Sequence, residues 1–90
     1  MNDIVKKDIK ERDIFIVLLD KELLGRGDIF ERVMYAKSIK KPMLLINHGN
    51  VSKEAIDGWF AGCNIVAIVT SGKERDAILK ERKVKSIFIT

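Results

Sequence analysis

Several residues with carboxylate or hydroxyl side chains are spaced so that they could do chemistry together on one helix. If Asp28 caps a helix that begins there, then Glu31, Tyr35 and Ser38 lie along one side of it, away from its main apolar stripe. A carboxylate beside a tyrosine hydroxyl can attack or stabilise an anomeric carbon, which is how N-glycosidic bonds are broken. The spacing makes Glu31 a candidate nucleophile, with Tyr35 as a candidate substrate-binding residue.

Glu31 also has a structural interpretation. Asp28 and Glu31 have the spacing of a capping box, in which Glu31 returns a hydrogen bond to the start of its own helix. On the sequence alone, this structural role is the favoured one of the two.

The segment before this helix is arranged like a ligand-binding loop. The apolar run Ile14–Leu19 ends at Asp20, and a loop containing Gly27 leads to the helix with Asp28 in its first turn. A strand, a glycine loop and a helix start of this kind can hold a sugar or a phosphate at the carboxyl end of the strand. We therefore expect Asp20, Gly27 and Asp28 to contribute to substrate binding.

His48 and Cys63 are the other side chains with possible chemistry. His48 follows the second apolar run on a predicted turn, where it could act as an acid or base or bind phosphate, although no catalytic partner is evident. Cys63 is the only cysteine, so neither an intrachain disulfide nor a cysteine zinc site can form. We interpret Cys63 as a small buried hydrophobe, keep His48 as a candidate binding residue, and predict no metal site and no cofactor.

Elements able to position these residues alternate along the chain. Residues 1–12 have the pattern of a short amphipathic helix, and Ser52 and Ser71 are good helix N-caps. The predicted strands have few polar residues, as expected when both faces of a sheet are covered. They are expected near residues 14–19, 43–47, 64–70 and 84–90, with helices from Asp28 towards Pro42, from Ser52 to Gly62 and after Ser71.

This alternation predicts one α/β domain over residues 1–90, with residues 13–90 forming the sheet and its helices. Parallel strands joined by right-handed helical crossovers give a doubly wound sheet of about four strands. The strand order cannot be read from the sequence. An apolar final strand, Ile87-Phe88-Ile89, could leave a sheet edge open to a second copy, so we expect a homodimer.

Composition limits the classes of partner and location. The net charge is +4, but Lys, Arg, Asp and Glu are interleaved, and the cations between Lys73 and Lys85 are interpreted as a solvated helix face. Nucleic acid is thus permitted but not indicated. The longest apolar run, Ile14–Leu19, has six residues and is too short to cross a bilayer, and the charged start is not typical of a signal peptide. We expect a soluble, cytoplasmic protein.

About thirty residues resemble the nucleoside deoxyribosyltransferase-like superfamily, which is related in fold to TIR domains. The resemblance lies in Asp13-Ile-Phe-Ile-Val-Leu-Leu-Asp20, the loop glycine Gly27, Glu31, Tyr35-Ala36 and Lys41-Pro42-Met-Leu-Leu-Ile. It implies a flavodoxin-like, or more broadly Rossmann-like, fold. It also implies that Glu31 matches the glutamate nucleophile that these enzymes direct at the sugar.

The resemblance implies a nucleoside, a nucleotide or NAD as the ligand and cleavage or transfer of an N-glycosidic bond as the reaction. Two alternatives remain open. One is a non-catalytic nucleotide-binding or signalling module that keeps the same sheet rim. The other is a homo-oligomeric assembly module in which Tyr35, Trp59 and the final strand form a protein interface.

Overall fold

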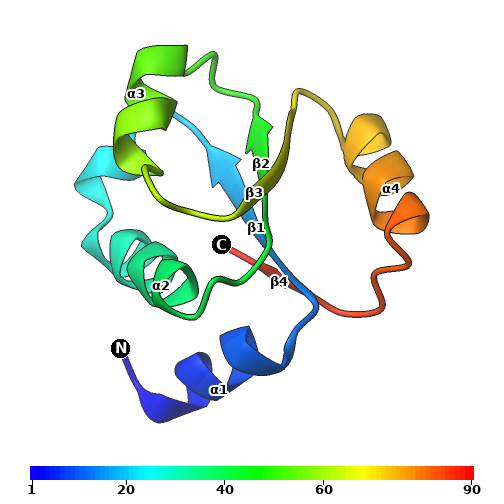
Figure 1. The fold of residues 1–90 in the computed structure, drawn as a ribbon. Helices are drawn as coiled ribbons and strands as arrows, with labels where there is room; N and C mark the ends of the chain where they lie inside the picture. The colour runs from blue at the N-terminus through cyan, green and yellow to red at the C-terminus, as the bar shows by residue number, and fades with distance from the viewer.

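Four parallel strands in the order β3-β2-β1-β4 form the centre of the molecule (Figure 1). The computed structural model describes residues 1–90 apart from the side chain of Leu24. The elements in chain order are α1 (Asp3–Glu11), β1 (Ile14–Leu19), a 3₁₀ turn (Leu23–Gly25), α2 (Gly27–Ser38), β2 (Met43–Asn47), α3 (Lys53–Trp59), β3 (Ile65–Val69), α4 (Gly72–Glu81) and β4 (Ile87–Ile89).

β1 and β2 are the inner strands, as their apolar sequences predict. β1 pairs with β2 from Phe15–Met43 to Leu19–Asn47, and with β4 on its other side. Nearly all of their side chains are buried, because helices cover both faces of the sheet at this point. The exception in β1 is Leu18, which is 43% exposed.

The helices lie on opposite faces of the sheet (Figure 1). α1, α2 and α3 cover one face, where Ile9, Val33 and Ile56 pack on Phe15 and Leu45. α4 alone covers the other, where Ile78 and Leu79 pack against a cluster formed by the three longer strands. Right-handed crossovers require this arrangement, because the chain steps from β1 to β2 to β3 in one direction and then returns across the sheet to β4.

The predicted doubly wound α/β fold is therefore confirmed. Its strand order is that of the first four strands in the Rossmann arrangement. None of the helices in the described part of the chain is both long enough and apolar enough to cross a membrane.

Two of the three predicted N-cap residues, Ser52 and Ser71, cap their helices in the structure. Ser52 Oγ accepts a hydrogen bond from the Ala55 N–H, and Ser71 Oγ accepts one from the Glu74 N–H, each at 3.2 Å. The prediction that Asp28 caps α2 is wrong. α2 begins one residue earlier, at Gly27, and its N-cap residue is Arg26, whose side chain makes no capping hydrogen bond. Asp28 lies instead in the first turn, where its charge still complements the helix dipole.

Three of the helix-to-strand connections contain a residue in the left-handed backbone region. Gly62 has a φ of 79° after α3, whereas Lys40 and Lys83 have a φ of 56° after α2 and α4. Glycine is the usual residue at such a helix end, because a side chain makes this conformation costly. Two of the three connections therefore have a lysine at a position where glycine would have a lower backbone conformational energy.

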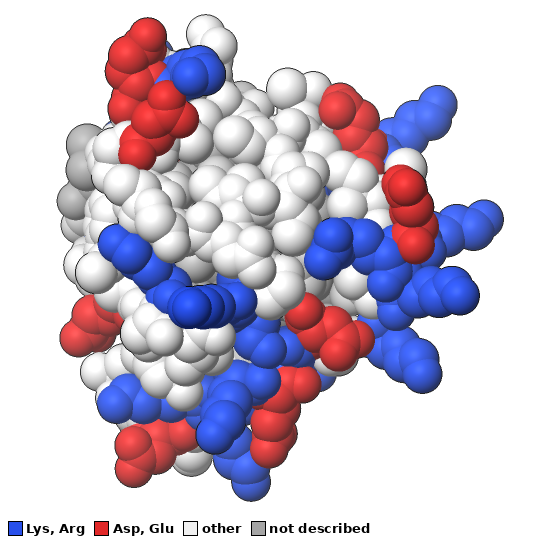
Figure 2. All heavy atoms as spheres, in the orientation of Figure 1, with Lys and Arg blue, Asp and Glu red and all other residues white. Residues whose placement is uncertain are grey.

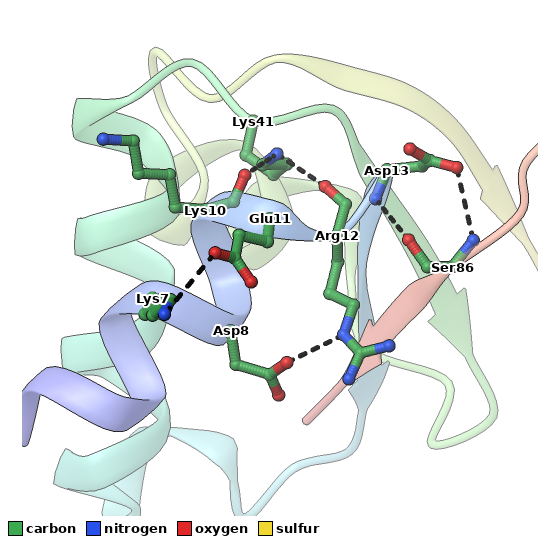
Figure 3. Close-up of polar contacts among 8 residues, drawn as sticks. All are labelled: Lys7, Asp8, Lys10, Glu11, Arg12, Asp13, Lys41 and Ser86. Atoms are coloured by element: carbon green, nitrogen blue, oxygen red, sulfur yellow. Dashed lines mark hydrogen bonds and ion pairs between the residues drawn. The ribbon is translucent and has the colours of Figure 1, made fainter.

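Hydrogen bonds join the segments at the amino end of the sheet (Figure 3). Lys41 Nζ donates to the carbonyls of Lys10 and Arg12 at 2.9 and 2.6 Å, which ties the end of α1 to the start of β2. The Asp13 carboxylate accepts from the N–H groups of Lys85 and Ser86 at 2.8 and 3.2 Å. These two hydrogen bonds, from Lys85 first and then Ser86, hold the pKa of Asp13 below its ordinary value.

Candidate functional site

A groove between α1 and α2 brings together three of the six predicted site residues. Its volume is about 560 Å³. Met1 and Lys6 line it from the α1 side, and the α2 side is formed by Gly27, Phe30, Glu31, Met34 and Tyr35. The three- and four-residue spacing along α2 places these side chains on one strip of the helix.

The Glu31 carboxylate is accessible in this groove. Its side chain is 59% exposed, and one oxygen lies 3.4 Å from the amino group of Met1. The capping-box interpretation is not supported, because Asp28 does not cap α2 and none of the described hydrogen bonds joins Glu31 to the helix start. The Glu31 side chain therefore does not cap α2.

Tyr35 lies one turn further along the same wall and is half-buried. Lys6 Nζ is 5.9 Å from the centre of its ring, within the range of a cation–π contact. Gly27 opens the groove at the other end, since a Cβ added there would meet nothing within 4 Å. The groove thus offers a carboxylate, an aromatic ring and an ammonium group.

Phe30 and Met34 also line the groove, so part of the apolar surface of α2 lies outside the core. The buried residues of α2 are Ile29, Val33 and Ala36, and Met34 is 54% exposed. Phe30 is half-buried and meets the edge of Trp59 at 6.3 Å between ring centres. The four-residue spacing of Phe30 and Met34 could have indicated this second apolar strip.

Asp20 lies away from the groove, in the loop that follows β1. Its Oδ1 accepts a hydrogen bond of 2.9 Å from the Glu22 N–H, so the carboxylate stabilises the loop itself. Gly49 packs against this point. A Cβ on Gly49 would lie 2.6 Å from Asp20 Cα, so only glycine fits without a shift of the backbone.

His48 and Asp28 are also outside the residues that line the groove. His48 is exposed on the turn after β2, next to Gly49, and Asp28 is exposed on the first turn of α2. The structure therefore divides the predicted site, with Gly27, Glu31 and Tyr35 at the groove, Asp20 and His48 after the carboxyl ends of β1 and β2, and Asp28 in neither group.

Most polar side chains at those strand ends bond to nearby backbone or to neighbouring side chains. The Asn47 side chain both donates to the Val51 carbonyl and accepts from the Val51 N–H, each at 2.9 Å. Thr70 Oγ1 donates to the Glu74 carboxylate at 2.8 Å, beside the Ser71 cap. These hydrogen bonds shape the loops at the carboxyl ends of the strands.

The described residues contain no group of three or more His, Cys, Asp and Glu side chains placed to hold a metal ion. Cys63 is half-buried, and burial raises the pKa of its thiol, an effect that the nearby Lys37 partly opposes.

Comparison of the chain with family models, with curated proteins and with solved structures found no match.

Proposed function

We propose that the groove between α1 and α2 binds a nucleoside or a nucleotide. The observation that carries this proposal is that Glu31, Tyr35 and Gly27 line one groove together. A volume of about 560 Å³ is within the range of small-molecule sites.

Each part of a nucleotide has a matching group in the groove. The Glu31 carboxylate can accept hydrogen bonds from two sugar hydroxyls. The rings of Tyr35 and Phe30 offer aromatic surface to a base, and Lys6 can meet a phosphate. This assignment supports recognition of the sugar by Glu31 and of the base by the aromatic rings.

Calorimetric titration with adenosine, AMP, NAD and the corresponding pyrimidine compounds tests the proposal. We expect saturable binding of at least one compound, weakened about tenfold or more by Glu31→Gln, because a hydrogen bond to a charged group contributes about 1.5–3 kcal/mol. Glu54→Gln is the matched control, since Glu54 is exposed on α3 outside the groove. Equal loss in both variants, or no binding of any compound, would reject the groove as the site.

Cleavage of the N-glycosidic bond is a second candidate function. It is favoured because the Glu31 carboxylate is exposed and makes no helix-capping hydrogen bond. Glu31 would attack the anomeric carbon as the base leaves with the bonding electron pair and takes a proton from water. A second water, or another base, would then release the sugar from the glycosyl ester. Chromatography for free base checks this step. Release by the native protein and by Glu31→Gln alike would eliminate Glu31 as the nucleophile.

We also propose that two copies associate through β4. This strand pairs only with β1, which leaves its outer edge open, and Ile89 is 48% exposed. Phe88 is unsuitable for a test because it stacks on Phe15 at 5.5 Å. Ile89→Asp should convert a dimer to a monomer in analytical ultracentrifugation, and a native protein that sediments as a monomer would contradict the proposal.

A further inference from the structure

We propose that the amino rim of the sheet binds the phosphate backbone of a nucleic acid. The amino rim consists of residues 10–13, 40–41 and 82–86, which connect α1 to β1, α2 to β2 and α4 to β4. The sequence alone favours a solvated face for the cations of the last segment. The structure adds observations on how the segments are joined, how their charges are paired and what backbone they adopt.

The three segments form one surface. Lys41 Nζ donates to the carbonyls of Lys10 and Arg12, and the Asp13 carboxylate accepts from the Ser86 N–H (Figure 3). The Asp13 carboxylate also accepts from the Lys85 N–H. Chain segments more than seventy residues apart are therefore held side by side, and each of them has cationic side chains.

Cations outnumber acids on this rim by seven to two. Arg12 is paired with Asp8 at 2.8 Å, and Lys41 is occupied by the two carbonyls. In the part of the chain that the structure describes, the other five cations have no carboxylate within 4.0 Å; they are Lys10, Lys40, Arg82, Lys83 and Lys85. Lys and Arg side chains spread from α4 and across the lower part of the molecule (Figure 2).

A cleft of about 400 Å³ lies within this rim and is lined by Asp13 and by residues 82–85. The one carboxylate in the cleft, that of Asp13, is directed at backbone N–H groups. Arg82, Lys83 and Lys85 are exposed there. A phosphate group could meet these three side chains without displacing an existing ion pair.

The backbone of Lys40 and Lys83 argues against a merely solvated surface. A residue with a side chain in the left-handed region costs about 1–2 kcal/mol, which glycine avoids. The connection after α3 uses Gly62, but the connections after α2 and α4, which belong to the rim, use lysine at a φ of 56°. A lysine at both of these strained positions supports a function for their charge.

Nucleic acid fits this rim better than a lipid surface does. Peripheral membrane segments insert apolar side chains beside their cations. Val84 is the only large apolar residue in the three segments, and it is half-buried against the sheet. A surface with cations and little apolar area matches the repeated phosphates of a nucleic acid backbone.

The test compares Lys40→Gly/Lys83→Gly with the native protein. Fluorescence anisotropy is measured with labelled duplex DNA, single-stranded DNA and single-stranded RNA over a range of salt concentrations. We expect the variant to bind about tenfold more weakly at 100 mM salt, with a salt-dependence slope smaller by about 2, because two phosphate contacts are lost. Its melting temperature should rise by about 10 °C, because glycine relieves the backbone cost at two positions.

The matched control is Lys21→Gln/Lys73→Gln, which removes the same net charge from exposed positions near the opposite rim. Binding by this control should be close to native. Equal weakening in both double variants would show that net charge alone attracts the nucleic acid, and would overturn the proposal. Undetectable binding by the native protein at 50 mM salt, or tighter binding to phosphatidylserine vesicles than to any nucleic acid, would overturn it as well.

Discussion

At both rims of the sheet some polar side chains bond to the backbone, but the amino rim also has five cations without a carboxylate within 4.0 Å among the described side chains. At the carboxyl rim, Asp20, Asn47 and Thr70 bond to backbone or side-chain groups of the loops that contain them or of the following helix. At the amino rim, Lys40 and Lys83 have side chains without an acidic partner and backbones in a costly conformation.

The comparison shows that residue type alone does not tell which polar side chains stabilise loops and which have no acidic partner. Ligands of open α/β sheets bind at the carboxyl ends of the strands, and the sequence has suitable residues there. Here those residues stabilise loops, whereas the groove beside α2 and the cations of the amino rim keep accessible groups.

The largest expected effect is at the carboxyl rim, from Gly49→Ala. The added Cβ would lie 2.6 Å from Asp20 Cα and 3.1 Å from the Leu19 carbonyl, both backbone atoms that cannot rotate away. We expect a loss of about 3 kcal/mol in the free energy of unfolding, measured by urea denaturation.

Gly27→Ala is the matched control, because its Cβ would meet nothing within 4 Å at the start of α2. It should leave stability unchanged or raise it by up to about 1 kcal/mol. If Gly49→Ala were equally harmless, the tight closure of the carboxyl rim would be refuted.

Substitution of one asparagine at each rim should have a smaller effect on stability, and the effect should differ between the rims. Asn47→Ala removes two hydrogen bonds of 2.9 Å to Val51 from a half-buried site and should cost about 2 kcal/mol. Asn64→Ala, at the amino end of β3, removes one exposed hydrogen bond of 3.3 Å to Lys40 and should cost clearly less. Thermal unfolding of both variants checks the order, and a reversed order would contradict the contrast between the rims.

The smallest effect is the pH dependence of Asp13 at the amino rim. Because its pKa is lowered in the folded state, its charge stabilises the fold above the unfolded pKa of about 3.9, and this contribution is lost as the pH falls through the folded pKa. Asp13→Asn should therefore melt below the native protein at pH 7, with a gap that closes in acid. A gap of constant size from pH 7 to pH 2.5 would exclude this linkage.

Much of the fold could be predicted because apolar runs and serine caps are strong local signals. Ile14–Leu19 and Met43–Asn47 are strands as expected, and Ser52 and Ser71 cap their helices. The last strand is shorter than its apolar pattern, because β4 pairs with β1 only at Ile14–Ile16. Strand order depends on tertiary crossovers and has no local signal.

The candidate site was less predictable than the fold. The spacing of Glu31 and Tyr35 located one wall of the groove, but the other wall is α1, whose contribution through Lys6 depends on how two helices pack. The left-handed lysines had no signal either, because residue type indicates such positions only when it is glycine or asparagine.

The position of β1 between β2 and β4 has a consequence for synthesis on the ribosome. Phe15 is made early, but its stacking partner Phe88 follows seventy-three positions later, and β1 has an unpaired edge until residues 87–89 have emerged from the exit tunnel. A nascent chain with a bare, wholly apolar strand is a substrate for chaperones that shield such edges. The yield of folded protein in cells should therefore depend more on translation speed and chaperone supply than the small size of the chain suggests.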